Sequence, residues 1–156
     1  MTVEAAKAWL ASHAPELTVI EPQASTATVA DAAAALGVEP GRIAKSLCLR
    51  VGEQVFVLMA RGDARLDNAR CKAELGGKPR MLGAEDTLAL TGHAVGGVCP
   101  FGLANELPVL SDRSLDHYTT VFPAAGSPNS AVEVSPARLA EVTAARWVSV
   151  CQEPAS

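Results

Sequence analysis

The sequence lacks the residue spacing of a metal site or a disulfide framework. Cys48, Cys71, Cys99 and Cys151 lie 23, 28 and 52 positions apart, with no CxxC pair and no clustered histidine. Zinc sites and disulfide-rich domains both need cysteines or histidines in closer, recurring patterns. We therefore predict that the protein holds no metal or cofactor, and that its cysteines are buried or surface thiols.

The sequence also lacks any long hydrophobic run. No stretch approaches the ~18 apolar residues of a membrane span. The first ten residues contain Glu4 and Lys7 where a secretory signal needs an uninterrupted apolar segment. These absences predict a cytoplasmic protein with no membrane partner.

Apolar residues, in contrast, are abundant. Of 156 residues, 49% are hydrophobic and only 4% are aromatic. A chain of this size buries about two thirds of the surface that its unfolded form exposes, so we predict a single domain over residues 1–156. The formal net charge of −4, from 13 Lys and Arg against 17 Asp and Glu, taken alone argues against a nucleic-acid partner.

The charge is unevenly distributed along the chain. Residues 1–41 carry −4, residues 42–80 carry +5 and residues 81–156 carry −5. The basic segment 42–80 therefore forms either a local positive face on an acidic protein or a solvated surface of mixed charge. Its basic residues are Arg42, Lys45, Arg50, Arg61, Arg65, Arg70, Lys72, Lys78 and Arg80.

Apolar spacing and turn residues predict interspersed helices and strands. Helices are expected at 3–13, 66–75 and 84–90, after Thr28 up to Gly37, and from Pro136 with Ser135 as N-cap. Strands are expected at 17–21, 43–51, 54–60, 80–82, 108–111, 119–122, 131–134 and 147–151. Gly52-Glu53 predicts an antiparallel hairpin. Because no regular βαβ rhythm appears, we predict a mixed α+β fold.

A glycine-rich segment, 92–102, is a candidate binding loop. It has three glycines and a proline within seven residues. Such a loop can direct consecutive N–H groups at a carbonyl oxygen or a phosphate, or it can be a tight structural turn. It matches neither the P-loop nor the dinucleotide-binding pattern.

Lys45 is the second unusual feature. Strand alternation places it on the same face as Ile43, Leu47 and Leu49, which are apolar. An amine there must reach water, pair with an acid or meet a ligand. Together with the glycine loop, Lys45 suggests a pocket for a polar, anionic group.

Four segments occur in an informative order: Ile-Ala-Lys-Ser-Leu at 43–47, Arg-Gly-Asp-Ala-Arg-Leu-Asp at 61–67, the loop 91–102 with its GxxxP motif, and Ala-Ala-Gly at 124–126. From about residue 25 to residue 150, the chain resembles the YbaK family. That family comprises the prolyl-tRNA synthetase editing domain and freestanding aminoacyl-tRNA deacylases. The resemblance implies one α+β domain with a mixed, curved sheet and surrounding helices.

The implied activity is hydrolysis of the ester that joins a wrong amino acid to the 3′ end of a tRNA. The implied partners are the acceptor end of a mischarged tRNA and an aminoacyl-tRNA synthetase. The residues implied for catalysis are Lys45, Gly96, Gly97, Val98 and Pro100. The residues implied for substrate binding are Thr26, Ser46, Ala125 and Gly126.

The resemblance also implies a division of roles. Lys45 matches a lysine that engages the terminal adenosine or its phosphate, and the GxxxP loop, 96–100, holds the ester through backbone groups. The amides of Gly97 and Val98 can supply donors for the developing oxyanion. A ribose hydroxyl of the substrate can position the water, so no nucleophilic side chain is required. The basic segment 42–80 then predicts a few phosphate contacts and a shallow salt dependence.

The sequence leaves alternatives open for three residues and for the function. Thr26 lines the amino-acid pocket or caps the following helix. His93 fills a position that is more often Tyr or Phe in relatives, or it serves as the base for a Cys99 nucleophile. Ala131 aligns with an aspartate of relatives that clear cysteinyl-tRNA, which leaves this specificity open. The alternative function is a non-catalytic module that binds aminoacyl-tRNA or a synthetase.

Overall fold

The computed structural model describes residues 3–152; the remaining residues of the predicted domain 1–156 lie outside the described part. The strands are β1 Val19–Ile20, β2 Ile43–Val51, β3 Gln54–Arg61, β4 Arg80–Met81, β5 Val109–Asp112, β6 Phe122–Pro123, β7 Ala131–Val132 and β8 Arg146–Val148. The helices are α1 Val3–His13, α2 Val29–Leu36, α3 Asn68–Leu75, α4 Ala84–Thr91 and α5 Pro136–Thr143, with 3₁₀ turns η1 Pro40–Arg42 and η2 Arg113–His117.

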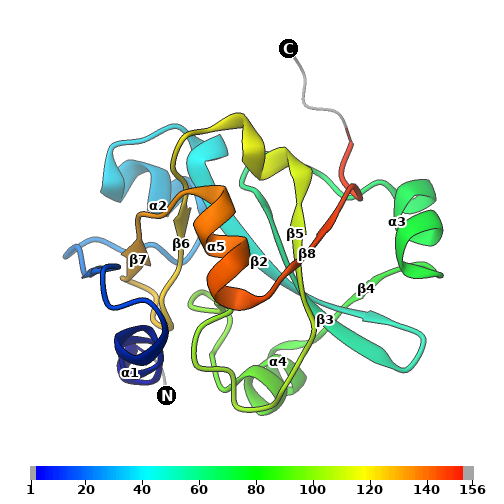
Figure 1. The fold of residues 1–156 in the computed structure, drawn as a ribbon, viewed down its shortest axis with the longest axis horizontal. Helices are drawn as coiled ribbons and strands as arrows, with labels where there is room; N and C mark the ends of the chain where they lie inside the picture. The colour runs from blue at the N-terminus through cyan, green and yellow to red at the C-terminus, as the bar shows by residue number, and fades with distance from the viewer. Residues whose placement is uncertain (1–2, 153–156) are drawn as a thin grey trace.

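The strands form two sheets, which confirms the predicted α+β fold (Figure 1). The main sheet is mixed and six-stranded, in the order β4-β2-β3-β5-β8, with β6 also beside β2. The strands β3, β5 and β8 run parallel, so their carboxyl ends meet at one edge. A separate two-stranded sheet pairs β1 with β7. Figure 1 shows α1, α2 and β7 at one end of the molecule and α3 at the other.

Local residue chemistry explains the elements that were predicted best. Thr28 caps α2 by accepting the Asp31 N–H at 3.0 Å, and Gly37 ends this helix with a left-handed φ of 68°. Ser135 caps α5 in the same way, through the Arg138 N–H at 3.1 Å. The β2–β3 hairpin pairs residues across its full length with Gly52 at the turn. These predictions are confirmed.

Other boundaries differ from the prediction because pairing and capping decide them. The helix expected from residue 66 begins as α3 at Asn68, since the Asp67 side chain accepts the Arg70 N–H and acts as N-cap. Leu66 instead forms an isolated bridge with Cys151. Likewise, β6, β7 and β8 are shorter than expected because only part of each extended segment meets a partner strand.

The core lies on both faces of the main sheet. One apolar cluster includes Leu10 of α1, Met59 of β3 and Phe101 of the glycine loop, and a second includes Leu49 of β2 and Leu58 of β3. Both clusters contain side chains that are fully buried, so the two faces of the β2–β3 hairpin are both packed. Within residues 3–152, every helix is too short or too polar to cross a lipid bilayer.

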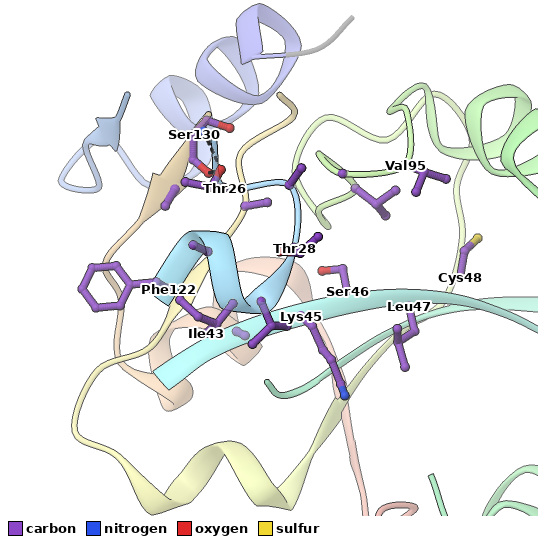
Figure 2. Close-up of a pocket in the computed structure, with 18 of the residues that line it drawn as sticks. Thr26, Thr28, Ile43, Lys45, Ser46, Leu47, Cys48, Val95, Phe122 and Ser130 are labelled. Atoms are coloured by element: carbon purple, nitrogen blue, oxygen red, sulfur yellow. Dashed lines mark hydrogen bonds between the residues drawn. The ribbon is translucent and has the colours of Figure 1, made fainter. Parts of the chain in front are cut away.

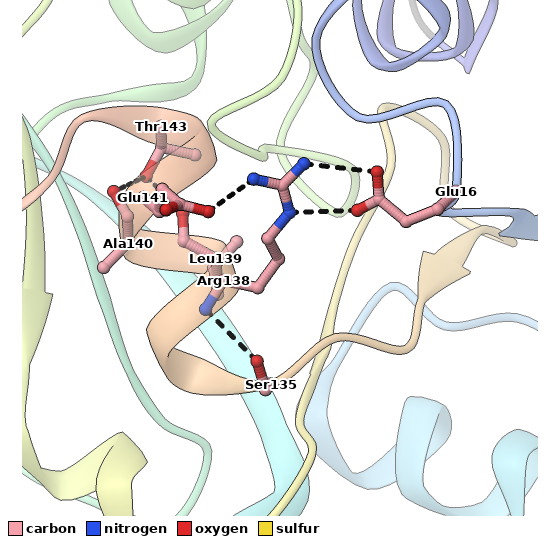
Figure 3. A network of polar contacts seen from close by, with 7 residues as sticks. All are labelled: Glu16, Ser135, Arg138, Leu139, Ala140, Glu141 and Thr143. Carbon is pink, nitrogen blue, oxygen red and sulfur yellow. Dashed lines mark hydrogen bonds and ion pairs between the residues drawn. The ribbon is translucent and has the colours of Figure 1, made fainter.

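A polar network joins α5 to the segment after α1 (Figure 3). Arg138 donates from Nε and Nη2 to Glu16 at 2.9 and 3.2 Å, and from Nη1 to Glu141 at 2.5 Å. The Arg138 guanidinium lowers the pKa of the Glu16 carboxyl. Because these side chains are partly or largely exposed, the network positions the chain more than it stabilises it.

Candidate functional site

A cavity of about 330 Å³ lies beside the middle of β2 (Figure 2). Its walls come from the segment that leads into α2, from β2 itself, from the glycine loop and from the strands β6 and β7. Most of the lining is apolar. The predicted site residues that line it are Thr26, Lys45, Ser46, Gly96 and Val98.

The floor of the cavity is an unpaired stretch of the β2 edge. The strand β6 pairs with Ile43 and Ala44, and β4 pairs with Leu49 and Arg50. Within the described chain, Ser46 between them has no strand partner on this side. On this edge the Cys48 carbonyl accepts the Leu82 N–H at 3.0 Å. Backbone groups two residues apart in a strand point to the same edge, so the N–H and carbonyl of Ser46 point there as well.

Ser46 also places its side chain in the cavity. Its Oγ is buried and has no hydrogen-bond partner among residues 3–152. An unpaired buried hydroxyl costs free energy, which a ligand that bonds to it would recover. Ser46 is therefore the main polar group that this face of β2 offers to a substrate.

The glycine loop forms the wall opposite Ser46. A Cβ on Gly97 would lie 2.7 Å from the Ser127 nitrogen, and a Cβ on Gly96, whose φ is 99°, would lie 3.3 Å from the Ala27 Cβ. The loop is thus wedged between the start of α2 and the turn at Gly126-Ser127, and only glycine fits at position 97.

The loop amides are not equivalent. The Gly97 N–H donates to the Ala94 carbonyl at 3.0 Å. The amides of Gly96 and Val98 have no acceptor within the part of the chain that the structure describes. Of the two amides expected to face an oxyanion, the Gly97 amide is thus already bonded and the Val98 amide is available.

Thr26 and Ser130 hold the third wall together (Figure 2). The Thr26 Oγ1 donates to the Ser130 carbonyl at 3.2 Å and accepts the Ser130 N–H at 3.0 Å. The Ser130 Oγ accepts the N–H groups of Ala125 and Ser127 at 3.2 and 3.1 Å. Thr26 therefore lines the cavity, and Thr28 caps α2 in its place.

Ser130 was not among the predicted site residues. The signal that could have found it is the turn-forming sequence Ser-Pro-Asn-Ser at 127–130, in which short polar side chains bond to nearby backbone. The remaining predicted residues, Gly97, Pro100, Ala125 and Gly126, are buried and are not among the residues that line the cavity. Ala131 is 2% exposed and lines the cavity.

Lys45 points away from Ser46, as the alternation of the strand predicts (Figure 2). Its Nζ donates to the Ala64 carbonyl at 2.5 Å, on the opposite face of β2. Burial lowers the pKa of the Lys45 ammonium, and the nearby Cys151 and Asp63 oppose this effect only in part. The cavity is lined by the stem of Lys45, whereas the charge lies beyond the strand.

Cys99 and His93 lie together but inside the core. Their Sγ and Nε2 atoms are 3.6 Å apart, and both residues are 0% exposed. Because the Phe101 carbonyl accepts from Nε2 at 2.7 Å, that nitrogen carries the proton. Burial lowers the pKa of His93 and raises the pKa of Cys99 to about 12. A buried, protonated thiol is no nucleophile, so His93 is a core residue and the Cys99 hypothesis is wrong.

Among residues 3–152, no three Cys, His, Asp or Glu side chains are grouped so that they could hold a metal ion. The polar side chains among the lining residues include the hydroxyls of Thr26, Ser46 and Ser130, and the Lys45 stem adds apolar surface. This arrangement can bind a substrate by hydrogen bonds and apolar contact, and it offers amide donors to a developing negative charge.

Comparison with known proteins gives a consistent set of relatives. A family model of the aminoacyl-tRNA editing domain matches residues 23–142. The uncharacterized protein YwhH of Bacillus subtilis is 47% identical over 137 residues, which cover 86% of this chain and 87% of YwhH. The proline–tRNA ligase of a Geobacter species is 32% identical over 90 residues, which cover 57% of this chain and 16% of the ligase.

A solved structure gives the same result. The crystal structure of a protein proposed to be a trans-editing enzyme for prolyl tRNA synthetase superposes with a TM-score of 0.89 and 32% identity, over 97% of each chain. The matched region thus corresponds to a small part of the proline–tRNA ligase and to nearly all of this solved protein.

Proposed function

The chain belongs to the aminoacyl-tRNA editing domain family, and we propose that it is a trans-editing hydrolase that deacylates mischarged tRNA. The family and the α+β fold agree with the resemblance of the lysine, GxxxP and Ala-Ala-Gly segments. The observation that carries the proposal is a mainly apolar cavity lined by Ser46, whose hydroxyl has no partner among residues 3–152, and by Thr26 and Val98. We propose further that residues 1–156 act as one editing domain.

The proposed reaction is hydrolysis of the aminoacyl ester by a water held against a ribose hydroxyl of the terminal adenosine. The water oxygen attacks the ester carbonyl carbon, and the Val98 N–H donates to the oxygen that becomes negative. The bond to the ribose oxygen then breaks. The ribose oxygen takes one proton of the attacking water, the other proton passes to solvent, and the amino acid leaves as a carboxylate.

The lining of the cavity favours an uncharged amino-acid side chain. Its apolar surfaces include Val29, Leu36, Ile43 and Phe122, and none of the lining residues is Asp or Glu. Burial of a charged side chain there would lack a compensating partner. Discrimination between neighbouring sizes would be limited, since one methylene is worth about 1–3 kcal/mol.

The mouth of the cavity suits the base of the terminal adenosine. Met81 and Val95 line it and remain 60% and 65% exposed, although both are apolar. A nucleobase packed against these side chains would cover them. We therefore place the adenine at Met81 and Val95, the ester at the glycine loop, and the amino-acid side chain beneath Thr26. The synthetase that charges the tRNA is the proposed protein partner.

A deacylation assay tests this function. Purified protein is incubated with tRNAs charged with a panel of amino acids, and ester loss is compared with spontaneous hydrolysis in the same buffer. We expect at least one ester with a small, uncharged side chain to be cleared faster than it hydrolyses alone. If every ester decays at its spontaneous rate, the proposal is wrong. Tight tRNA binding without turnover would instead identify a non-catalytic binding module.

A further inference from the structure

A second hollow, of about 290 Å³, lies where the carboxyl ends of β3, β5 and β8 meet. Ligands commonly bind at the carboxyl ends of parallel strands in open α/β sheets. We call it the carboxyl-end pocket. The basic and hydroxyl side chains that line it are Arg61, Arg70, Arg113, His117, Ser114 and Ser149.

The carboxyl-end pocket has an excess of positive charge. Asp112 is the one acidic residue that lines it; it is 2% exposed, and its carboxylate accepts the N–H groups of Ser114 and Val150 at 3.0 and 2.8 Å. The exposed Arg113 lies over the Trp147 ring, 6.0 Å from its centroid. No carboxylate among residues 3–152 forms an ion pair with Arg113, so its charge is available to an anion.

Two further guanidinium groups are held in position around the pocket. Arg61 bonds to both carboxylate oxygens of Asp63 at 2.6 and 3.1 Å and lies over the Tyr118 ring at 5.2 Å. Arg70 donates to the Cys151 carbonyl at 2.8 Å. Fixed side chains lose little conformational entropy when they bind, and a guanidinium matches phosphate oxygens in geometry.

Lys45 connects this pocket to the cavity. Its ammonium donates to the Ala64 carbonyl, and the Ala64 N–H donates to the Arg61 carbonyl at 2.9 Å. The Lys45 charge therefore lies on the same turn that carries Arg61. The cavity is lined by both Lys45 and Ser46, which leave opposite faces of β2, so it reaches the edge of the strand.

We propose that the carboxyl-end pocket binds phosphodiester groups at the acceptor end of the tRNA, with Arg113 as the principal contact. This inference rests on the proposed function, which places the terminal adenosine in the cavity. The RNA backbone then follows the strand edge past Lys45 to the arginines. Arg61 and Arg70 of the pocket, and Lys45 beside it, come from the segment 42–80, whereas Arg113 comes from an acidic part of the chain.

RNA binding tests this assignment directly. The variant is Arg113→Glu, and the matched control is Arg146→Glu, which reverses an exposed arginine at the amino end of β8. The probe is an uncharged RNA hairpin that mimics the acceptor stem and its 3′ single strand, followed by fluorescence anisotropy at several salt concentrations. We expect Arg113→Glu to weaken binding about tenfold and to reduce the salt slope by about one contact, and Arg146→Glu to change binding by less than about twofold.

Kinetics separate this inference from the proposed function. The aminoacylated hairpin carries phosphates, whereas aminoacyl-adenosine carries none. We expect Arg113→Glu to lower kcat/KM about tenfold for the hairpin and to leave aminoacyl-adenosine cleavage unchanged; Arg113→Ala should give a smaller loss in the same direction.

The failure of the pocket assignment and the failure of the proposed function give different experimental results. If the wild-type protein cleaves both substrates but Arg113→Glu matches Arg146→Glu in binding and cleavage, the pocket assignment is overturned and the function stands. If the wild-type protein cleaves neither substrate, the proposed function fails, and the hairpin binding of the same two variants still decides whether the pocket contacts RNA.

Discussion

The two faces of β2 differ in how their polar side chains are paired. On one face, the Ser46 hydroxyl is buried without a partner in the described chain and faces an apolar cavity. On the other face, the Lys45 ammonium donates to the Ala64 carbonyl and lies near Asp63 and Arg65. Ester hydrolysis needs a dry, uncharged space, whereas an RNA backbone needs positive charge. Strand alternation lets neighbouring residues meet both needs, because consecutive side chains leave opposite faces.

We expect the largest effect on activity from Gly97→Ala, which changes the glycine loop that forms one wall of the cavity. The new Cβ would lie 2.7 Å from the Ser127 nitrogen and 2.8 Å from the Gly126 carbonyl carbon, and backbone atoms cannot yield easily. The loop must move, and the Val98 amide moves with it. We expect deacylation to fall by at least about 100-fold, as when an oxyanion donor is lost.

Gly83→Ala is the control for this variant. A Cβ on Gly83 meets no atom within 4 Å, and its φ of −69° suits alanine. It should therefore retain normal kcat/KM, with only a small fall in melting temperature because Gly83 is the N-cap of α4. Full activity in Gly97→Ala, measured with the same charged tRNA, would show that the tight fit of the loop does not matter for the reaction.

Lys45→Met tests the charged face. We expect kcat/KM for charged tRNA to fall about tenfold or more, through loss of a phosphate contact. Stability should change little, because loss of the bond to the Ala64 carbonyl is offset by removal of an ammonium whose charged form burial already opposes. Lys78→Met, in the same basic segment but exposed, is the control. A loss of stability in Lys45→Met would instead assign Lys45 a structural role.

Much of the fold follows from local sequence. Thr28, Gly37 and Ser135 determine helix ends through bonds to residues within a few positions, and Gly52 determines a hairpin turn. Such contacts are short in sequence, so a pattern can predict them. The alternation that places Lys45 and Ser46 on opposite faces is equally local.

The arrangement of the site is not local. Thr26 and Ser130 are 104 positions apart, and no pattern in either segment indicates that they bond. The unpaired edge at Ser46 exists because two strands of only two residues each, β4 and β6, pair with β2 on either side of it. The Gly97 amide, expected to be available, is bonded to Ala94 by the bend of the loop itself. Tertiary contacts decide the first two of these features, and the local bend of the loop decides the third.

The pH dependence of stability tests whether the thiols on the two sides of the main sheet are buried from water to the same extent. Burial raises the pKa of Cys99, on the cavity side, and of Cys151, on the Lys45 side, to about 12 from 9.0. Between these values the folded state binds more protons than the unfolded state, so the free energy of unfolding falls as pH rises. At about pH 10.5, each thiol should have lowered the free energy of unfolding by about 2 kcal/mol relative to its value below pH 9.

Urea unfolding at pH 8 and at about pH 10.5 measures this fall. Cys99→Ala and Cys151→Ala should each reduce it by a similar amount, because both thiols are nearly inaccessible. Equal reductions would show that the faces differ in charge and not in burial. If only one variant reduces the fall in stability, the thiol that the other variant removes lies on the face that water reaches.

The smallest effect is expected from Ser46→Ala, which removes the hydroxyl that lacks a partner. We expect kcat/KM to fall about fivefold, the value of one hydrogen bond of about 1 kcal/mol. Stability should not fall, because no bond within residues 3–152 is lost. Ser111→Ala is a close control, since Ser111 in β5 is also buried with no side-chain partner in the described residues, but lies outside the cavity. If both variants keep full activity, the Ser46 hydroxyl does not contact the substrate, and the cavity face acts through its shape and the loop amides alone.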